Sequence, residues 1–165
     1  MFWLERRAAA RYGWLMRFAA LLVGLAFFAL AAAAAEPTWH LSMQLYSLHE
    51  HTTQDDLTNN TPGIGIMRRT ETNWMAGAGI FRNSIGRTAG YGYVGKQWPL
   101  GRVLAGAIAG VTHHYRFNNG GIVPLGAAVV TVPLNDRWSI DLVGIPPIRD
   151  FTYATLNFSV SWRFR

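Results

Sequence analysis

Three histidines and an Asn-Ser pair are the residues of this chain best suited to acid–base chemistry. His40, His49 and His51 come first in the sequence, and Asn83 and Ser84 follow. A histidine can take a proton near neutral pH, and a serine or asparagine can orient a group or donate a hydrogen bond to an oxyanion. A base must come within hydrogen-bonding reach of the proton that it removes. The elements that carry these residues therefore decide which of them can act together.

Other kinds of chemistry find less support in the sequence. The chain of 165 residues has no cysteine, which excludes disulfides, thiolate nucleophiles and cysteine-based zinc sites. It contains no Gly-x-Ser-x-Gly, His-Glu-x-x-His or phosphate-binding Walker motif. His49 and His51 lie close to Asp55 and Asp56, but a loop cluster of this kind is ordinarily solvated. We therefore predict no metal site.

The first 35 residues have the features of an export signal. Arginines precede the uncharged stretch 18–35, which ends in small residues before Glu36. This order is typical of a cleaved signal peptide, which we prefer to a single membrane helix. Residues 1–35 hold four arginines and one glutamate, so residues 36–165 keep 11 basic and 8 acidic residues and a net charge of +3. Because no basic stripe remains, we expect no nucleic-acid partner.

Residues 36–165 alternate between apolar and polar side chains with a period of two. In the clearest segment Leu156, Phe158 and Val160 alternate with Asn157 and Ser159. Strands of about ten residues with this pattern, separated by turns, are typical of a transmembrane β-barrel. We predict an all-β fold, an eight-stranded antiparallel transmembrane β-barrel of the outer membrane formed by residues 36–165. The predicted strands are 38–48, 62–69, 73–81, 88–95, 101–112, 122–132, 138–145 and 153–164.

The strand order places the candidate residues at two ends of the barrel. An even strand number puts both chain ends on the periplasmic side, with short turns there and longer loops outside. We expect the short turns at 70–72, 96–100 and 133–137. His40 then begins the first strand at the periplasmic end, whereas His49 and His51 lie beside the loop of Ser84. The alternative fold is a soluble β-sandwich or lipocalin-like barrel, whose outer face would need more Lys and Glu than these strands contain.

Glycine and proline suggest how the barrel interior is used. Many glycines beside aliphatic residues either leave an apolar slot or relieve crowding in a curved sheet, and composition alone favours neither. By parity Gly92 is expected on the inner face. Pro124 and Pro146 flank the predicted sixth and seventh strands, and proline donates no hydrogen bond to a neighbouring strand. They either part these strands and admit a lipid chain, or simply bound the loops.

Five short segments carry a resemblance to a known family. They are FRNS (81–84), AGYGY (89–93), AGVT (109–112), IVPL (122–125) and IP (145–146). In order and spacing they resemble the lipid A palmitoyltransferase family (PagP), whose members are eight-stranded outer-membrane barrels. The resemblance implies an enzyme that moves a palmitoyl chain from a glycerophospholipid to lipid A without a cofactor. It implies these membrane lipids as partners, and we expect a monomer.

The family has a catalytic histidine on the extracellular side and an Asp-Ser pair in the second loop. Ser84 matches the serine, and Asn83 stands where the family has aspartate, so a carboxylate is missing. The tripeptide around His40 also matches, but His40 lies about a membrane thickness from Ser84 at ~3.3 Å per residue. We therefore take His51 as the base, with His49 and His40 as alternatives.

In this interpretation Asn83 and Ser84 orient a group or stabilise an oxyanion. Gly92 forms the floor of the acyl pocket, and Pro124 and Pro146 bound the gap that admits lipid. The alternative function is a non-enzymatic outer-membrane barrel of structural, adhesive or lipid-binding type, which the missing carboxylate favours. Basic residues at the rim, Arg82 among them, can meet lipid A phosphates or simply be solvated.

Overall fold

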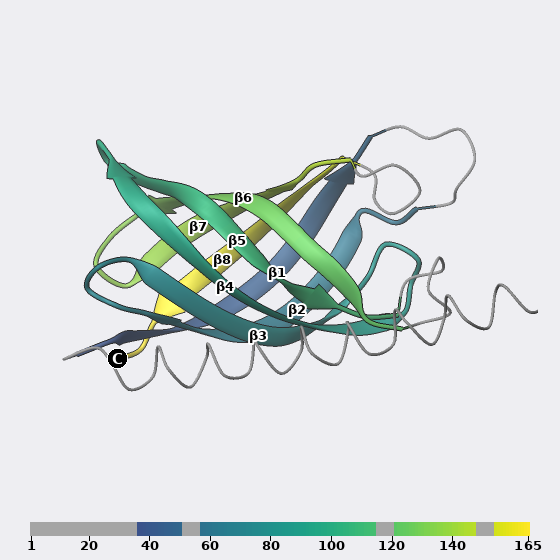
Figure 1. Cartoon of the computed structure of the whole chain (residues 1–165), viewed down its shortest axis with the longest axis horizontal. Helices are drawn as coiled ribbons and strands as arrows, with labels where there is room; N and C mark the ends of the chain where they lie inside the picture. The colour runs from purple at the N-terminus through teal and green to yellow at the C-terminus, as the bar shows by residue number, and fades with distance from the viewer. Residues whose placement is uncertain (1–35, 51–56, 115–120, 148–153) are drawn as a thin grey trace, which may run out of the picture.

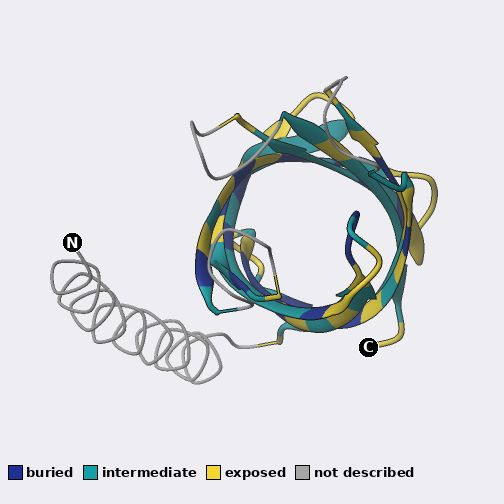
Figure 2. Cartoon of the chain, turned by 90° about the vertical axis from the view of Figure 1, so that its right-hand side faces the viewer, coloured by how far each residue is buried: buried dark blue, intermediate teal, exposed yellow. Residues whose placement is uncertain are grey.

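Eight antiparallel strands form a closed barrel in which the last strand pairs with the first (Figure 1). The computed structural model describes residues 36–50, 57–114, 121–147 and 154–165. Viewed from one end, the strands form a continuous ring (Figure 2). The strands are β1 (Thr38–His49), β2 (Asn60–Arg69), β3 (Trp74–Arg82), β4 (Thr88–Leu100), β5 (Val103–Thr112), β6 (Val123–Pro133), β7 (Trp138–Ile145) and β8 (Thr155–Arg163). The predicted strand number and fold class are confirmed, whereas the predicted signal segment 1–35 lies outside the described residues.

The two ends of the barrel differ. Short turns at 70–73, 101–102 and 134–137 join strands at one end, here called the turn end. The described chain also begins and finishes there, because Trp39 N–H donates to the carbonyl of Arg165 at 2.7 Å. The opposite end, here called the loop end, holds the strand termini His49, Arg82 and Ile145.

The turn between β4 and β5 is shorter than predicted. We expected a turn at 96–100, but β4 continues to Leu100, which pairs with Val103. Gly101 and Arg102 alone make the turn, and Gly101 has a φ of 62°. Two-residue hairpin turns of this kind need positive φ, which glycine adopts without steric cost. The predicted turn at 96–100 is therefore wrong.

The outer face of the barrel is apolar. Paired residues on neighbouring antiparallel strands project to the same face, so the register separates the two faces. Ile64, Ile80 and Leu156 lie outside and are 51%, 58% and 37% exposed, whereas Asp141 and Ser161 lie inside and are buried. Large apolar side chains around a closed ring suit lipid rather than water. The soluble alternative is wrong, and the transmembrane barrel is confirmed.

Aromatic side chains form a girdle at the turn end. All five tryptophans of residues 36–165 lie on outer-face positions near that end: Trp39, Trp74, Trp98, Trp138 and Trp162. The rings of Trp138 and Trp162 lie 6.2 Å apart, and Lys96 Nζ lies 5.5 Å from the centre of the Trp74 ring. Amphipathic rings of this kind favour the boundary between lipid and water. No helix in the described part of the chain is long and apolar enough to cross a membrane.

A β-bulge changes which face the end of β1 presents. The register of β1 shifts between Gln44 and Tyr46, and Tyr46 then pairs with outward Phe158. A strict alternation from Ser42 and Gln44 would place Tyr46 on the polar inner face, but the bulge inserts one residue and turns Tyr46 outward. The shift turns Ser47 and His49 inward, so His49 enters the interior at the loop end.

Glycines of the inner face lie beneath two tyrosine rings. Tyr91 and Tyr93 stack with their centres 6.1 Å apart. A Cβ on Gly77 would lie 2.6 Å from Tyr93 Cζ, and one on Gly65 would lie 2.3 Å from the Tyr91 hydroxyl oxygen. These glycines therefore relieve crowding, and at these positions the rings fill the space that a slot would need.

Gly92 lies on the outer face. It pairs with Ala78 and Val111, whereas its neighbours Tyr91 and Tyr93 point inward. The prediction that Gly92 faces the interior is wrong, so Gly92 is not the floor of an internal pocket. Around Gly92 the large side chains Tyr91 and Tyr93 point inward, the reverse of β8, so faces assigned from residue size are wrong in this part of β4.

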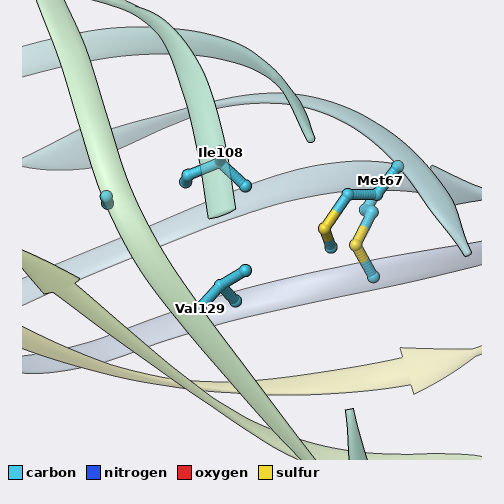
Figure 3. Close-up of a cluster of buried hydrophobic side chains, with 5 residues drawn as sticks. Met67, Ile108 and Val129 are labelled. Carbon is cyan, nitrogen blue, oxygen red and sulfur yellow. The ribbon is translucent and has the colours of Figure 1, made fainter. Parts of the chain in front are cut away.

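The interior is apolar at mid-height and polar towards the turn end. Met67, Ile108 and Val129 belong to the buried apolar cluster (Figure 3). Further towards the turn end, Thr131 Oγ1 donates to Asp141 at 2.5 Å, and Ser161 Oγ also donates to Asp141.

Arg69 completes this polar group. Its Nη2 donates to Gln97 Oε1 at 3.0 Å and to Thr131 Oγ1 at 3.4 Å. Thr131 therefore links the partly buried side chain of Arg69 to the carboxylate of Asp141.

Candidate functional site

Among the described residues, the wall of the barrel opens between β6 and β7 at the loop end. The register between these strands ends at Ala128 and Gly144, although β6 continues to Val123. Pro124 lies on this part of β6, and Pro146 follows the last residue of β7. In the part of the chain that the structure describes, β6 and β7 are therefore unpaired beyond Ala128 and Gly144, and Pro146 itself bounds the loop after β7. Use of this opening by a lipid stays a prediction.

An apolar pocket of about 510 Å³ occupies this opening. Ala107 and Ala128 belong to the outer face of the sheet, whereas Ile108 and Ala127 belong to the inner face. Since the lining combines both faces, the pocket lies within the wall, between the lipid-facing surface and the apolar core. The full lining is Ala107, Ile108, Ala127, Ala128, Gly144, Ile145, Pro146, Pro147 and Ala154. A lining of this kind suits an alkyl chain rather than a polar ligand.

Asn83 is committed to the structure of its own loop. Its side chain is completely buried, and Oδ1 accepts the Arg87 N–H at 2.9 Å. Its Nδ2 donates to the His114 carbonyl at 3.0 Å, which ties the β3–β4 loop to the end of β5. An aspartate can accept in this way but cannot donate, so the carboxamide has a structural reason to be here.

His49 is held by an asparagine that the sequence analysis missed. His49 Nδ1 lies 3.1 Å from Asn59 Oδ1. Because a carboxamide oxygen only accepts, Nδ1 is the donor, and in the neutral imidazole Nε2 then keeps its lone pair. This is the state of an oriented base, as in the His-Asn pairs of papain-like proteases.

The segment that holds His49 also contacts Ser84. Thr58 N–H donates to the Ser84 carbonyl at 2.8 Å, and Ser47 N–H donates to the Asn59 carbonyl at 2.9 Å. Thr58 and Asn59 therefore bridge the end of β1 and the loop of Ser84. A polar residue just before the second strand, opposite the end of the first, was the only sequence signal for Asn59.

The other two candidate histidines have different places. His40 pairs with Met67 and Arg163 near the turn end. At ~3.3 Å per residue, it lies about 30 Å along β1 from His49. The structure does not bring His40 together with Ser84. His51 lies outside the described residues.

His113 and His114 form part of the loop-end rim. Gly90 N–H donates to His113 Nε2 at 2.8 Å, and His114 Nδ1 donates to the Thr88 carbonyl at 2.6 Å. Burial, and then the nearby His114, lower the pKa of His113 below its ordinary value. His113 is therefore neutral at pH 7 and acts as an acceptor.

No group of three or more His, Cys, Asp or Glu side chains is placed to hold a metal ion among the described residues. His51, Asp55 and Asp56 lie outside them.

Comparison with known proteins gives a likeness of fold. No family model matches the sequence, and no curated protein matches it. Among solved structures, the chain is similar to the outer membrane protein Ail of Yersinia pestis, determined in a phospholipid bilayer nanodisc. The two are 16% identical with a TM-score of 0.46, over 78% of this chain and 100% of that one.

Proposed function

We propose that this protein is an outer-membrane acyltransferase that moves a palmitoyl chain from a glycerophospholipid to lipid A. The observation that carries the proposal is the apolar pocket in the wall where β6 and β7 part. A phospholipid in the outer leaflet can place one acyl chain there without leaving the membrane plane. Pockets of about 300–1,000 Å³ are the size that holds small ligands.

The loop-end residues supply the acid–base chemistry of the proposal. His49 Nε2, oriented through Asn59, takes the proton of a lipid A hydroxyl. The resulting oxygen attacks the ester carbonyl of the phospholipid. Ser84 donates a hydrogen bond to the oxyanion, and the lysophospholipid oxygen leaves with the proton from His49. His51 is the second candidate for the base.

A non-enzymatic, lipid-binding barrel is the second candidate function. Asn83 favours it, because its carboxamide is occupied by Arg87 and His114 and no carboxylate stands beside Ser84. The tyrosine rings above the inner glycines favour it as well, since they occupy part of the interior.

Replacing Ser84 by alanine is expected to reduce palmitoylated lipid A by about 100-fold or more, because one oxyanion donor is lost. The loss in stability should be about 1 kcal/mol or less. The measurement is mass spectrometry of lipid A from cells with the chain, without it and with each variant. Ser42→Ala, on the same barrel but near the turn end, is the matched control and should behave as the wild type. Unchanged palmitoylation in a folded Ser84→Ala barrel would contradict the proposed role of Ser84.

Replacing Ala127 by tryptophan is expected to close the wall pocket. Ala127 lines the pocket on the inner face, and a large ring there fills the space that an acyl chain needs. Palmitoylated lipid A should fall to the level of cells without the protein. The control is Ile140→Trp, on the outer face of β7 towards the turn end. Folding is checked by the gel shift of heated against unheated protein, and normal transfer by folded Ala127→Trp would exclude the pocket as the acyl site.

A further inference from the structure

Two arginines project from the loop-end rim of β3 and β4. Arg82 pairs with Thr88 on the outer face, and Arg87 immediately precedes Thr88; both arginines are exposed. Gly86, with a φ of 79°, turns the loop back over this edge. A Cβ on Gly86 would lie 3.7 Å from the Arg82 guanidinium, so that group rests against the loop. The Arg82 guanidinium therefore lies beside this loop, at the loop end of the barrel.

No described acidic residue lies on this rim. Among the described residues, the acids are Glu36, Glu50, Glu71, Asp136 and Asp141. Glu50 follows β1, Asp141 is inside the barrel, and the other three lie at the turn end. His113 and His114 continue the rim on β5 as polar groups. The charged side chains that the structure describes on β3–β5 at this end are therefore positive, which favours phosphate groups.

Below this rim the outer wall carries Ile80, Val94 and Val111, and beside them lies a group of small side chains. The residues are Ala76 and Ala78 on β3, Gly90 and Gly92 on β4, Ala105, Ala107 and Ala109 on β5, and Gly126 and Ala128 on β6. The opposite wall carries bulky side chains, among them Leu41, Met43, Ile64, Ile66, Ile140, Leu142, Leu156 and Phe158. Small residues let several acyl chains lie close against the sheet.

The small-residue wall runs into the pocket between β6 and β7. Ala107 and Ala128 belong both to the wall and to the lining of that pocket. A lipid lying against the wall therefore has its chains next to the opening. The rim and the wall are independent features, one charged and one apolar, and they select the same side of the barrel.

We propose that the outer face of β3–β6, capped by Arg82 and Arg87, is the docking surface for lipid A. A lipid with phosphates on a rigid sugar and several chains matches both the basic rim and the group of small residues below it. A glycerophospholipid has one phosphate and two chains, so it makes fewer contacts with the basic rim and covers less of the wall. The inference rests on the proposed function only for the choice of lipid A as acceptor, which the wall would hold beside the acyl pocket.

The test is binding of purified lipid A to the full chain in detergent micelles, measured by native mass spectrometry. The probe is bisphosphorylated, six-chain lipid A, with its dephosphorylated form and phosphatidylglycerol as comparisons. Arg82→Gln with Arg87→Gln should weaken binding about tenfold or more, which corresponds to about 1.4 kcal/mol. The matched control, Arg102→Gln with Arg137→Gln at the turn end, should bind as the wild type does.

A second pair of variants tests the wall. Ala109→Phe adds a ring to the small-residue wall and should weaken binding of lipid A whether or not it is phosphorylated. Val160→Phe adds the same ring to the bulky wall on β8 and should leave binding unchanged. Dephosphorylated lipid A should bind the arginine variant and the wild type equally weakly.

Two outcomes would overturn the docking surface. One is that lipid A binds the double arginine variant as tightly as the wild type. The other is that phosphatidylglycerol loses as much affinity as lipid A does in this variant, because that result would show a general attraction to anionic lipid. The assay contains no acyl donor, so it is independent of transfer. Arginine-dependent binding without any transfer supports the docking surface and the non-enzymatic function, whereas normal transfer without such binding overturns the docking surface alone.

Discussion

Replacing Asp141 by alanine should destabilise the barrel by about 3–5 kcal/mol. Asp141 is buried and accepts hydrogen bonds from Thr131 and Ser161. Through Thr131 it is linked to Arg69, whose guanidinium lies in the same part of the interior. Without the carboxylate, that cation stays in a low-dielectric interior with its negative partner removed. The measurement is urea unfolding of the barrel in lipid vesicles.

A double-mutant cycle isolates the interaction energy between Asp141 and Arg69 from the effects of other neighbours. Asp136→Ala, in an exposed turn, is the control and should change stability by about 0.5 kcal/mol or less. Arg69→Met in the Asp141→Ala background should restore part of the loss, because it removes the uncompensated charge. If the two single effects simply add, the guanidinium and the carboxylate act independently and the proposed coupling is wrong.

Replacing Asn83 by aspartate should loosen the loop-end rim rather than create activity. The Asn83 carboxamide donates to the His114 carbonyl, and a carboxylate in its place would put a buried negative charge against a carbonyl oxygen. We expect a loss of about 2–3 kcal/mol. Trypsin cleavage after Arg82 and Arg87 should become faster, and the rate of hydrogen exchange of the Arg87 backbone N–H should increase. The opposite hypothesis, a lost catalytic carboxylate, predicts more palmitoylated lipid A in this variant.

Asn135 gives the matched control. Its Oδ1 accepts the N–H groups of Arg137 and Trp138, each at 2.9 Å, in the turn before β7. These described hydrogen bonds use the side chain only as an acceptor, which aspartate also provides. Asn135→Asp should therefore be tolerated. Equal tolerance of Asn83→Asp would show that the donor to His114 is dispensable.

The sequence pattern alone was sufficient to assign the two faces of a strand where one face is wholly apolar. In β8, Leu156, Phe158 and Val160 alternate with polar residues, and the structure places them outside. The reason is that lipid and interior make opposite demands on successive side chains, so the pattern reveals the faces directly. Strand number was also predicted, because turn residues act locally. The parting near Pro124 and Pro146 was one of two alternatives that the sequence left open.

The faces of β4 and of the end of β1 depended on tertiary structure. In β4 both faces mix glycine with other residues, and only pairing with Gly77 and Gly110 shows that Tyr93 points inward. In β1 the bulge before Tyr46 reverses the alternation and brings His49 inside. Neither the faces of β4 nor the bulge in β1 can be recognised from the alternation of residues within a single strand.

The candidate site was only partly visible in the sequence for the same reason. Ser84 and the histidines were recognised by type, but the partner of His49 is Asn59, across the β1–β2 connection. The role of Asn83 depends on His114, 31 residues further along the chain. The alternation of apolar and polar residues indicates whether each face of a strand lies against lipid or against the barrel interior. Which side chains meet across strands is decided by register and closure of the barrel, because these bring residues distant in sequence within hydrogen-bonding reach.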